Sequence, residues 1–250
     1  MKEQNAALAT GRLSLVSVGV GDVDNITVKA LKTIESAHVV FGMGFIVKQY
    51  GHLLEGKEVH DSGHASFLGM SSTAGPRPPT REEELTAIAI IRDAVAAGKN
   101  VVVLDFGDPT LYSPQAGYLV EFADLQPEVV PGISSFNAAN AVLRKELSGN
   151  FDRPVVITHA MAGRDDGDHL ETLAAAGATL VFFTMGMDLK RVTETLKRRL
   201  PRDTPAVIVR QAGFERKQTA ISATLDTIVA KVDGASLPWA YLLYVGEALK

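Results

Sequence analysis

The sequence contains no cysteine, and this absence removes several kinds of chemistry. Disulfides, thiolate metal sites and cysteine nucleophiles all need the missing side chain. The remaining residues give no hint of a metal site, so we expect the protein to hold none. A cysteine-free chain also fits a reducing compartment.

Long apolar runs and an excess of positive charge are missing as well. The first ten residues lack the apolar core of a signal peptide, and no later run reaches the roughly 18 apolar residues of a membrane span. The 25 Lys and Arg residues face 29 Asp and Glu residues, a formal net charge of −4 at pH 7. Nucleic-acid proteins usually carry a basic surface. We therefore expect a cytoplasmic protein that binds neither nucleic acid nor a membrane.

Short, nearly continuous apolar runs recur along the first half of the chain, as in parallel strands that are covered on both faces. Apolar residues at helical spacing lie between these runs and predict helices at Thr27–Glu35 and Glu82–Ala97. Thr80 and Glu83 have the spacing of a capping box that opens the second helix. The runs predict strands at Leu13–Val18, Val39–Phe41, Val101–Phe106 and Val129–Val130. This alternation predicts an α/β domain.

The second half repeats the alternation after an Ala-rich helical segment and a break at Ser148–Asn150. This break suggests two domains, over residues 11–148 and 149–250. The elements predicted in the second domain are strands at Val155–Thr158, Thr179–Thr184, Ala206–Arg210 and Tyr241–Val245, and helices at His169–Ala175 and Leu189–Leu200.

Three motifs follow predicted strands of the first half: Gly19–Asp22, Leu104–Tyr112 with Gly107-Asp108-Pro109 at its centre, and Val130–Ser135. Glycine and proline in such loops let a ligand approach the backbone. Ligands of α/β folds bind at the carboxyl ends of the strands. Each motif alone also fits an ordinary turn or helix cap, but their common placement favours binding loops.

In this order, the three motifs resemble those of the tetrapyrrole (corrin and porphyrin) methylase superfamily. Three later segments resemble the same family: Thr179–Met185, Ala206–Gly213 and Pro238–Gly246. The resemblance covers about residues 12–248. It implies two α/β domains, with a mainly parallel sheet in the first, a mixed sheet in the second and a cofactor cleft between them.

The resemblance also implies an S-adenosylmethionine-dependent methyltransferase that acts as a homodimer on a tetrapyrrole or corrinoid intermediate. Carried over by position, the cofactor contacts would come from Phe106, Gly107, Asp108, Leu111, Ser134, Ser135, Met185, Ala212 and Ala240. Methyl transfer from a sulfonium is an in-line displacement, so alignment and exclusion of water matter more than a dedicated base.

The long segment His60–Thr80, rich in Ser, Gly and Pro, lies where the family builds part of its substrate wall. We expect His64 and Arg81 to act on the substrate side, with Arg77 as a further candidate, because arginine can bind the carboxylates of a tetrapyrrole bidentately. Each could equally be an ordinary surface residue. His159 and Arg210 lie at the ends of predicted strands of the second domain and could face the cleft. His52, Asp22 and Asp105 are similar candidates, and ordinary structural roles are expected for most of these residues.

The sequence departs from the family pattern at three places. Ser17 stands where many members have glycine, and Val20 where a proline is common. The segment Gly42–Phe45 lacks the aspartate of the uroporphyrinogen-type enzymes, which favours the corrin branch or a more distant one.

Three other functions stay open. A peptide-backbone N-methyltransferase of the borosin type would place an arginine where Arg81 stands, but its central loop would differ from Gly107-Asp108-Pro109, and a tyrosine would be expected near Glu84. Methylases of ribosomal RNA and diphthamide share the fold too, although the net negative charge of the chain makes RNA a less favoured substrate. The third alternative is a regulatory protein that binds the cofactor without turnover.

Overall fold

The computed structural model describes residues 11–69, 77–161, 167–232, 237–238 and 241–250. It divides into two compact units, Met1–Ser134 and Ser135–Lys250. The division comes before the break at 148–150 because helix α5 (Ser135–Leu143) packs on strands of the second unit. Each unit is described by itself.

The first unit is built on a five-stranded sheet in the order β3-β2-β4-β1-β5, and every pair is parallel. In its centre, Leu13 of β1 lies opposite Val101 of β4. This is the parallel sheet that the sequence predicted. The strands are β1 (Leu13–Ser17), β2 (Val39–Gly42), β3 (Glu58–Asp61), β4 (Val101–Asp105) and β5 (Glu128–Val130).

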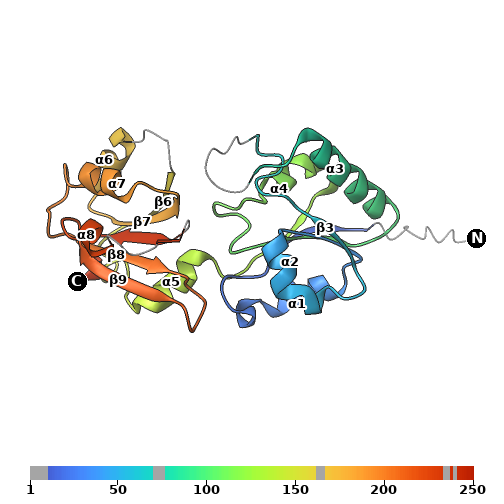
Figure 1. Cartoon of the computed structure of the whole chain (residues 1–250), viewed down its shortest axis with the longest axis horizontal. Coiled ribbons are helices and arrows are strands. Elements are labelled where there is room, and N and C mark those ends of the chain that lie inside the picture. Colours follow the sequence, from blue (N-terminus) through green and yellow to red (C-terminus); the bar gives the residue numbers. More distant parts are fainter. Residues whose placement is uncertain (1–10, 70–76, 162–166, 233–236, 239–240) are drawn as a thin grey trace, which may run out of the picture. The chain divides into compact units, whose positions relative to one another are not determined.

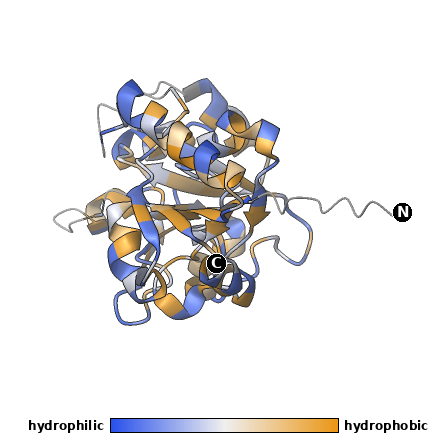
Figure 2. Cartoon of the chain, turned by 90° about the vertical axis from the view of Figure 1, so that its right-hand side faces the viewer, coloured by the Kyte–Doolittle hydropathy of each residue, from blue (hydrophilic) through white to orange (hydrophobic). Residues whose placement is uncertain are grey.

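Helices cover both faces of this sheet, with α1 and α2 on one and α3 and α4 on the other (Figure 1). Alternation along β1 explains both layers, because Val16 packs with Ile34 of α1 and Leu15 with Ile91 of α3. Coloured by hydropathy, the strands are largely apolar and the helices mixed (Figure 2). The helices are α1 (Val28–Glu35), α2 (Gly44–Tyr50), α3 (Arg81–Ala96) and α4 (Gly117–Glu121), with 3-10 turns η1 (Val23–Asn25), η2 (Gly51–Leu53) and η3 (Ala123–Leu125).

The second unit has a mixed five-stranded sheet in the order β6-β7-β10-β8-β9, as the resemblance implied. Only β6 and β7 run parallel among its described pairs. Its strands are β6 (Val155–Met161), β7 (Thr179–Met185), β8 (Pro205–Arg210), β9 (Thr219–Thr224) and β10 (Leu242–Val245). Its helices are α5, α6 (Gly167–Ala175), α7 (Leu189–Leu196), α8 (Ile228–Val232) and the 3-10 turn η4 (Glu247–Leu249).

The predicted capping box is present at the start of α3. The Thr80 hydroxyl accepts a hydrogen bond from the backbone N–H of Glu83 at 3.3 Å. The Glu83 carboxylate accepts one from the N–H of Thr80 at 2.6 Å. Two N–H groups that the helix leaves unpaired are thereby satisfied.

Within the described ranges, no helix is long and apolar enough to cross a membrane.

Candidate functional site

The first two predicted loops are joined directly at the carboxyl edge of the parallel sheet. The Gly107 N–H donates to the carbonyl of Gly19 at 3.0 Å, and the Val18 N–H donates to the carbonyl of Asp105 at 2.9 Å. Gly19 has φ +74° and Gly107 φ +91°, which other residues adopt only with strain. A Cβ on Gly19 would also lie 2.3 Å from the carbonyl oxygen of Asn25. Both glycines are therefore required by the backbone of this site.

Ser17, the last residue of β1, connects all three loops. Its fully buried hydroxyl donates to the carbonyl of Gly107 and accepts from the N–H of Gly19 at 2.9 Å. A Cβ on Gly132 would come within 1.9 Å of this hydroxyl. The residue that departs from the family pattern is thus the point where the three motifs meet.

Asp105, the last residue of β4, is fully buried beneath the central loop. Its carboxylate accepts hydrogen bonds from the Ser113 hydroxyl and from the N–H of Phe106, the latter at 2.8 Å. Burial raises the pKa of Asp105 to about 6, although both hydrogen bonds oppose this shift. Asp105 therefore has a structural role beneath the loop.

The central loop uses its own N–H groups internally. Oδ1 of Asp108 accepts from the N–H and the hydroxyl of Thr110, at 2.8 and 2.7 Å. The Asp108 carbonyl accepts from the N–H of Leu111 at 3.2 Å. The N–H groups of Phe106 and Gly107 are also taken, as described above. Four N–H groups of the loop, those of Phe106, Gly107, Thr110 and Leu111, are thus paired, and the carbonyls of Gly107 and Asp108 each accept one hydrogen bond.

A buried hydrogen-bond network links this loop to the segment that carries His64. The Ser113 hydroxyl accepts from the N–H of Gln115 at 2.9 Å. The Gln115 amide donates to the hydroxyl of Ser62 at 3.0 Å and to the carbonyl of Gly63 at 2.9 Å. The Tyr118 hydroxyl donates to the carbonyl of Ser62 at 2.8 Å. The structure therefore fixes residues 62 and 63 to the central loop, and sequence analysis did not single out Gln115 or Ser62.

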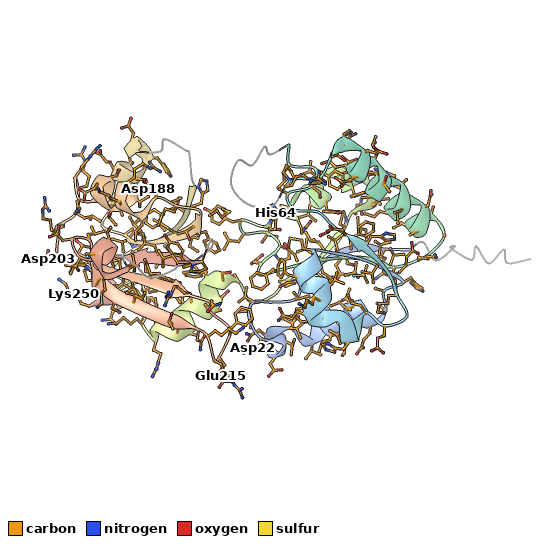
Figure 3. The ribbon with its side chains drawn as sticks, viewed as in Figure 1. Asp22, His64, Asp188, Asp203, Glu215 and Lys250 are labelled. Carbon is orange, nitrogen blue, oxygen red and sulfur yellow. The ribbon has the colours of Figure 1, made fainter. Side chains whose placement is uncertain are left out.

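His64 follows this anchor and is half-buried (Figure 3). Burial lowers its pKa, so the neutral ring predominates at neutral pH. The same segment is held from α3, where the Glu84 carboxylate accepts from the N–H of Phe67 at 2.8 Å. Ala65 and Phe67 have φ of 61° and 62°, so this backbone is held in a strained form.

Arg81 lies at the start of α3 and is exposed, with Nη1 3.2 Å from Oε2 of Glu84. Through Glu84, Arg81 is thereby connected to the segment that carries His64. Arg77 forms a separate ion pair with Glu83 at 2.8 Å. These contacts bring Arg81 and His64 to neighbouring parts of the first unit but show no contact between them.

Two of the predicted cofactor residues of the second unit, Met185 and Ala212, come to one edge of its sheet. Met185 ends β7, Ala212 follows the end of β8, and β10 begins at Leu242, which lies opposite Phe183 of β7 and Val209 of β8. Since β10 runs antiparallel to both, its start lies at the same edge as their ends. Ala240 lies outside the described residues.

The chain next to Ala240 is nevertheless anchored. The buried Thr184 hydroxyl donates to the carbonyl of Tyr241 at 2.6 Å and accepts from its N–H at 2.9 Å. Thr184 directly precedes Met185. The start of β10 is therefore fixed beside the end of β7.

Ser134 is buried and Ser135 is the first residue of α5. They stand on the two sides of the division between the units. Their predicted contact with the cofactor stays a prediction.

The minor candidates of the sequence lie at scattered positions. Asp22 immediately precedes η1, apart from His64 in Figure 3, and His52 is exposed in η2. His159 lies in β6, and Nε of Arg210 donates to the hydroxyl of Thr219 at 3.1 Å. Among the residues whose placement is described, no three His, Asp or Glu side chains gather as metal ligands would.

Comparison with known proteins agrees with this geometry. A precorrin-4 C(11)-methyltransferase of Rhodococcus erythropolis is 29% identical over 94% of this chain and 90% of its own. The solved structure of a cobalt precorrin-4 methyltransferase is 27% identical, covers 96% of each chain and has a TM-score of 0.74. A uroporphyrin-III C-methyltransferase of Thermus thermophilus, solved in complex with S-adenosylhomocysteine, shares the fold at 21% identity and a TM-score of 0.67, covering 96% of this chain and 99% of its own. The family model of the Tetrapyrrole (Corrin/Porphyrin) Methylases matches residues 12–229, and the chain therefore belongs to this family of methyltransferases.

Proposed function

We propose that this chain transfers the methyl group of S-adenosylmethionine to a carbon atom of a corrinoid of the precorrin-4 type. The observation that carries the proposal is the joining of the loops at Gly19, Gly107 and Gly132 through Ser17, at the edge of the sheet where α/β folds bind ligands. The corrin-type relatives and the segment Gly42–Phe45 support the choice of acceptor.

The chemistry of the central loop fits this cofactor. S-adenosylmethionine, when bound, supplies a methyl group on a positively charged sulfonium. The carbonyl oxygens of Gly107 and Asp108 already accept one hydrogen bond each, and the second lone pair of each would be available to that charge. Residues Phe106–Asp108 and Leu111 of the first unit, with Met185, Ala212 and Ala240 of the second, are the proposed contacts. Ser134 and Ser135 complete the set.

The remaining work of the protein is to align the acceptor and exclude water. His64 and Arg81 are the proposed residues on the substrate side. Because the anchors at Ser62 and Phe67 hold the His64 segment from two directions, this segment would be a rigid wall. The exposed guanidinium of Arg81 could bind a propionate or acetate group of the tetrapyrrole.

Calorimetric titration with S-adenosylmethionine and S-adenosylhomocysteine tests the cofactor step. Replacing Gly107, φ +91°, by alanine strains the loop by roughly 1–2 kcal/mol. The matched control is Gly56→Ala, because Gly56 also has a positive φ, +74°, but precedes β3 at the opposite edge of the same sheet. We expect weaker binding of both ligands by Gly107→Ala and unchanged binding by Gly56→Ala.

Transfer of a labelled methyl group then tests the acceptor. Uptake by a precorrin-4-type corrinoid but not by uroporphyrinogen III is the expected result. Uptake by uroporphyrinogen III alone would replace the proposed acceptor, and uptake by a peptide would favour the borosin-type function. Tight cofactor binding without uptake by any of them would favour the regulatory function, and a wild type that binds neither ligand would overturn the proposal.

We further propose that two copies of the chain associate, as the family resemblance implies. Light scattering on the purified protein tests this, and a mass of 26.7 kDa at all concentrations would contradict it.

A further inference from the structure

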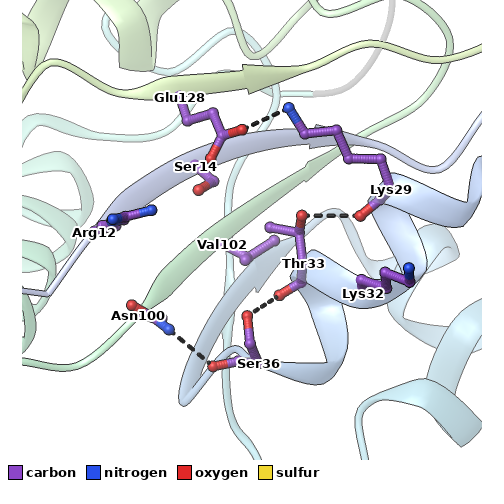
Figure 4. Close-up of a pocket in the computed structure, with 9 residues that line it drawn as sticks. All are labelled: Arg12, Ser14, Lys29, Lys32, Thr33, Ser36, Asn100, Val102 and Glu128. Atoms are coloured by element: carbon purple, nitrogen blue, oxygen red, sulfur yellow. Dashed lines mark hydrogen bonds and ion pairs between the residues drawn. The ribbon is translucent and has the colours of Figure 1, made fainter.

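A pocket of about 260 Å³ lies under α1, between this helix and the strands β1, β4 and β5 (Figure 4). Arg12 and Asn100 line it, and they directly precede β1 and β4. It therefore lies at the amino edge of the sheet, whereas the loops at Gly19 and Gly107 follow the carboxyl ends of the same strands. The pocket is distinct from the proposed cofactor site.

The floor of the pocket contains a buried polar group where the core pattern calls for an apolar one. On the α1 side of β1, Ser14 stands in a row with Val16 and Val18, and both valines belong to the core. Ser14 is 5% exposed. Its hydroxyl faces the pocket (Figure 4) and has no hydrogen-bond partner in the part of the chain that the structure describes. The Ser14 oxygen is not among the sealed, unpaired polar atoms of the described chain but is open to the pocket, so a ligand that enters can accept its hydrogen bond.

The rim of the pocket carries a positive charge that is not neutralised. Lys29 pairs with Glu128 at 2.6 Å, and both line the pocket. Arg12 and Lys32 also line it, and neither has a carboxylate within ion-pair distance among the described residues. After the Lys29–Glu128 pair cancels, two cations therefore face the pocket.

The position of the lysines follows from the spacing of α1. Lys29, Lys32, Thr33 and Ser36 recur at helical intervals and form one polar stripe of this helix. The adjacent stripe, with Ala30 and Ile34, packs into the core. The helix thus turns its polar side, with both lysines, to the pocket while its apolar side packs on the sheet.

We propose that this pocket binds a phosphate group. Arg12 would bind two of its oxygens through its planar guanidinium, Lys32 would add a second charge, and the Ser14 hydroxyl would donate a hydrogen bond from below. The volume is below the roughly 300–1,000 Å³ of pockets for drug-sized ligands, which fits a small anion. The Glu128 carboxylate also lines the pocket beside Ser14, where Lys29 neutralises it at 2.6 Å.

Calorimetric titration of the full chain with inorganic phosphate and with glycerol phosphate tests the proposal. Arg12 and Lys32 are exposed, so the double variant Arg12→Gln/Lys32→Gln should fold normally. We expect it to bind the tighter of the two ligands at least about tenfold more weakly. The matched control is Lys48→Gln/Lys190→Gln, which removes the same charge from exposed positions on α2 and α7.

Ser14→Ala separates the proposed site from general charge attraction. It should weaken binding about threefold or more while leaving the charge unchanged. Tighter binding of glycerol phosphate would identify a phosphate ester as the ligand, and tighter binding of inorganic phosphate would identify the free anion. The proposal is overturned if the wild type binds neither, if the control loses as much affinity as the double variant, or if Ser14→Ala binds as the wild type does. Titration with S-adenosylmethionine on the same samples keeps this result separate from the proposed methyl transfer.

Discussion

Gly132 lies directly against the hydroxyl of Ser17, since a Cβ on Gly132 would be 1.9 Å from Ser17 Oγ and 2.5 Å from Ser17 Cβ. The two residues come from the ends of different strands, and their contact fixes the spacing of the loops that follow. A side chain at position 132 and the serine at position 17 are therefore incompatible.

Gly132→Ala should destabilise the protein by about 1–3 kcal/mol, because the added methyl group overlaps Ser17. Ser17→Gly should also destabilise it, because the bonds to Gly107 and Gly19 are lost. The double variant should lose less stability than the two single variants lose together. With glycine at position 17, the methyl group added at position 132 has no side chain to overlap. Urea unfolding of the four proteins measures this coupling. Strict additivity would show that the two positions do not touch.

Asp105 should make the protein less stable as the pH rises. Its pKa is about 6 in the folded state and roughly 3.9 in an unfolded chain, so the folded state binds the proton more tightly. The stability that protonation provides is present below about pH 4 and is lost as the pH rises to about 6.

Asp105→Asn carries no charge and should lose this dependence. Its stability relative to the wild type should therefore grow by roughly 1–3 kcal/mol between about pH 4 and 6 and then stay constant. Denaturant unfolding of both proteins across this pH range measures the difference between their stabilities. Other carboxylates, such as Glu83, contribute equally to both proteins and cancel in this difference. A difference that is flat over this range would show that Asp105 titrates normally.

Glu84→Ala should loosen the segment that carries His64, because the Glu84 carboxylate holds the N–H of Phe67 and the guanidinium of Arg81. If this segment contacts the acceptor, KM for the acceptor should rise several-fold, while the Kd for S-adenosylmethionine should stay the same. Glu82→Ala, an exposed change on the same turn of α3, is the control. Equal effects of the two variants would argue against a substrate-side role for the segment.

Thr184→Val keeps the shape of the side chain but removes both bonds of its hydroxyl to the backbone of Tyr241. The Tyr241 carbonyl keeps its bond from the Thr184 N–H at 3.2 Å, but the buried Tyr241 N–H is left unpaired, so stability should fall by about 1–3 kcal/mol. Thr172→Val removes one hydroxyl bond on the exposed face of α6 and should change stability by less than about 0.5 kcal/mol. Thermal unfolding compares the two. Similar small losses in both would mean that the anchor at Tyr241 contributes little.

Much of the architecture could be predicted because the central strands are continuous apolar runs. Strands β1, β4, β7 and β8 were all predicted near their observed bounds. The edge strands β3 and β9 were missed because they are largely exposed and lack such runs. Helices α2 and α4 were missed too, since each is short and begins at a glycine.

The candidate site was predictable where it depends on backbone turns. Glycine and proline after buried strands marked the loops at Gly19 and Gly107, which the structure joins. The network from Asp105 through Ser113 and Gln115 to Ser62 could not be predicted, because it connects positions that are far apart in the chain and no local pattern marks a buried glutamine.

The order of strands in the first unit has a consequence for synthesis on the ribosome. Strand β1 is made first, but its two neighbours are β4 and β5, with Leu13 opposite Val101 and Ser14 opposite Glu128. The apolar strand β1 therefore has no partner strand until most of the unit has left the ribosome. An unpaired apolar strand can meanwhile associate with wrong partners. This unit should therefore depend more on chaperones during translation than the second unit, where β8 and β9 are adjacent in sequence and form a hairpin.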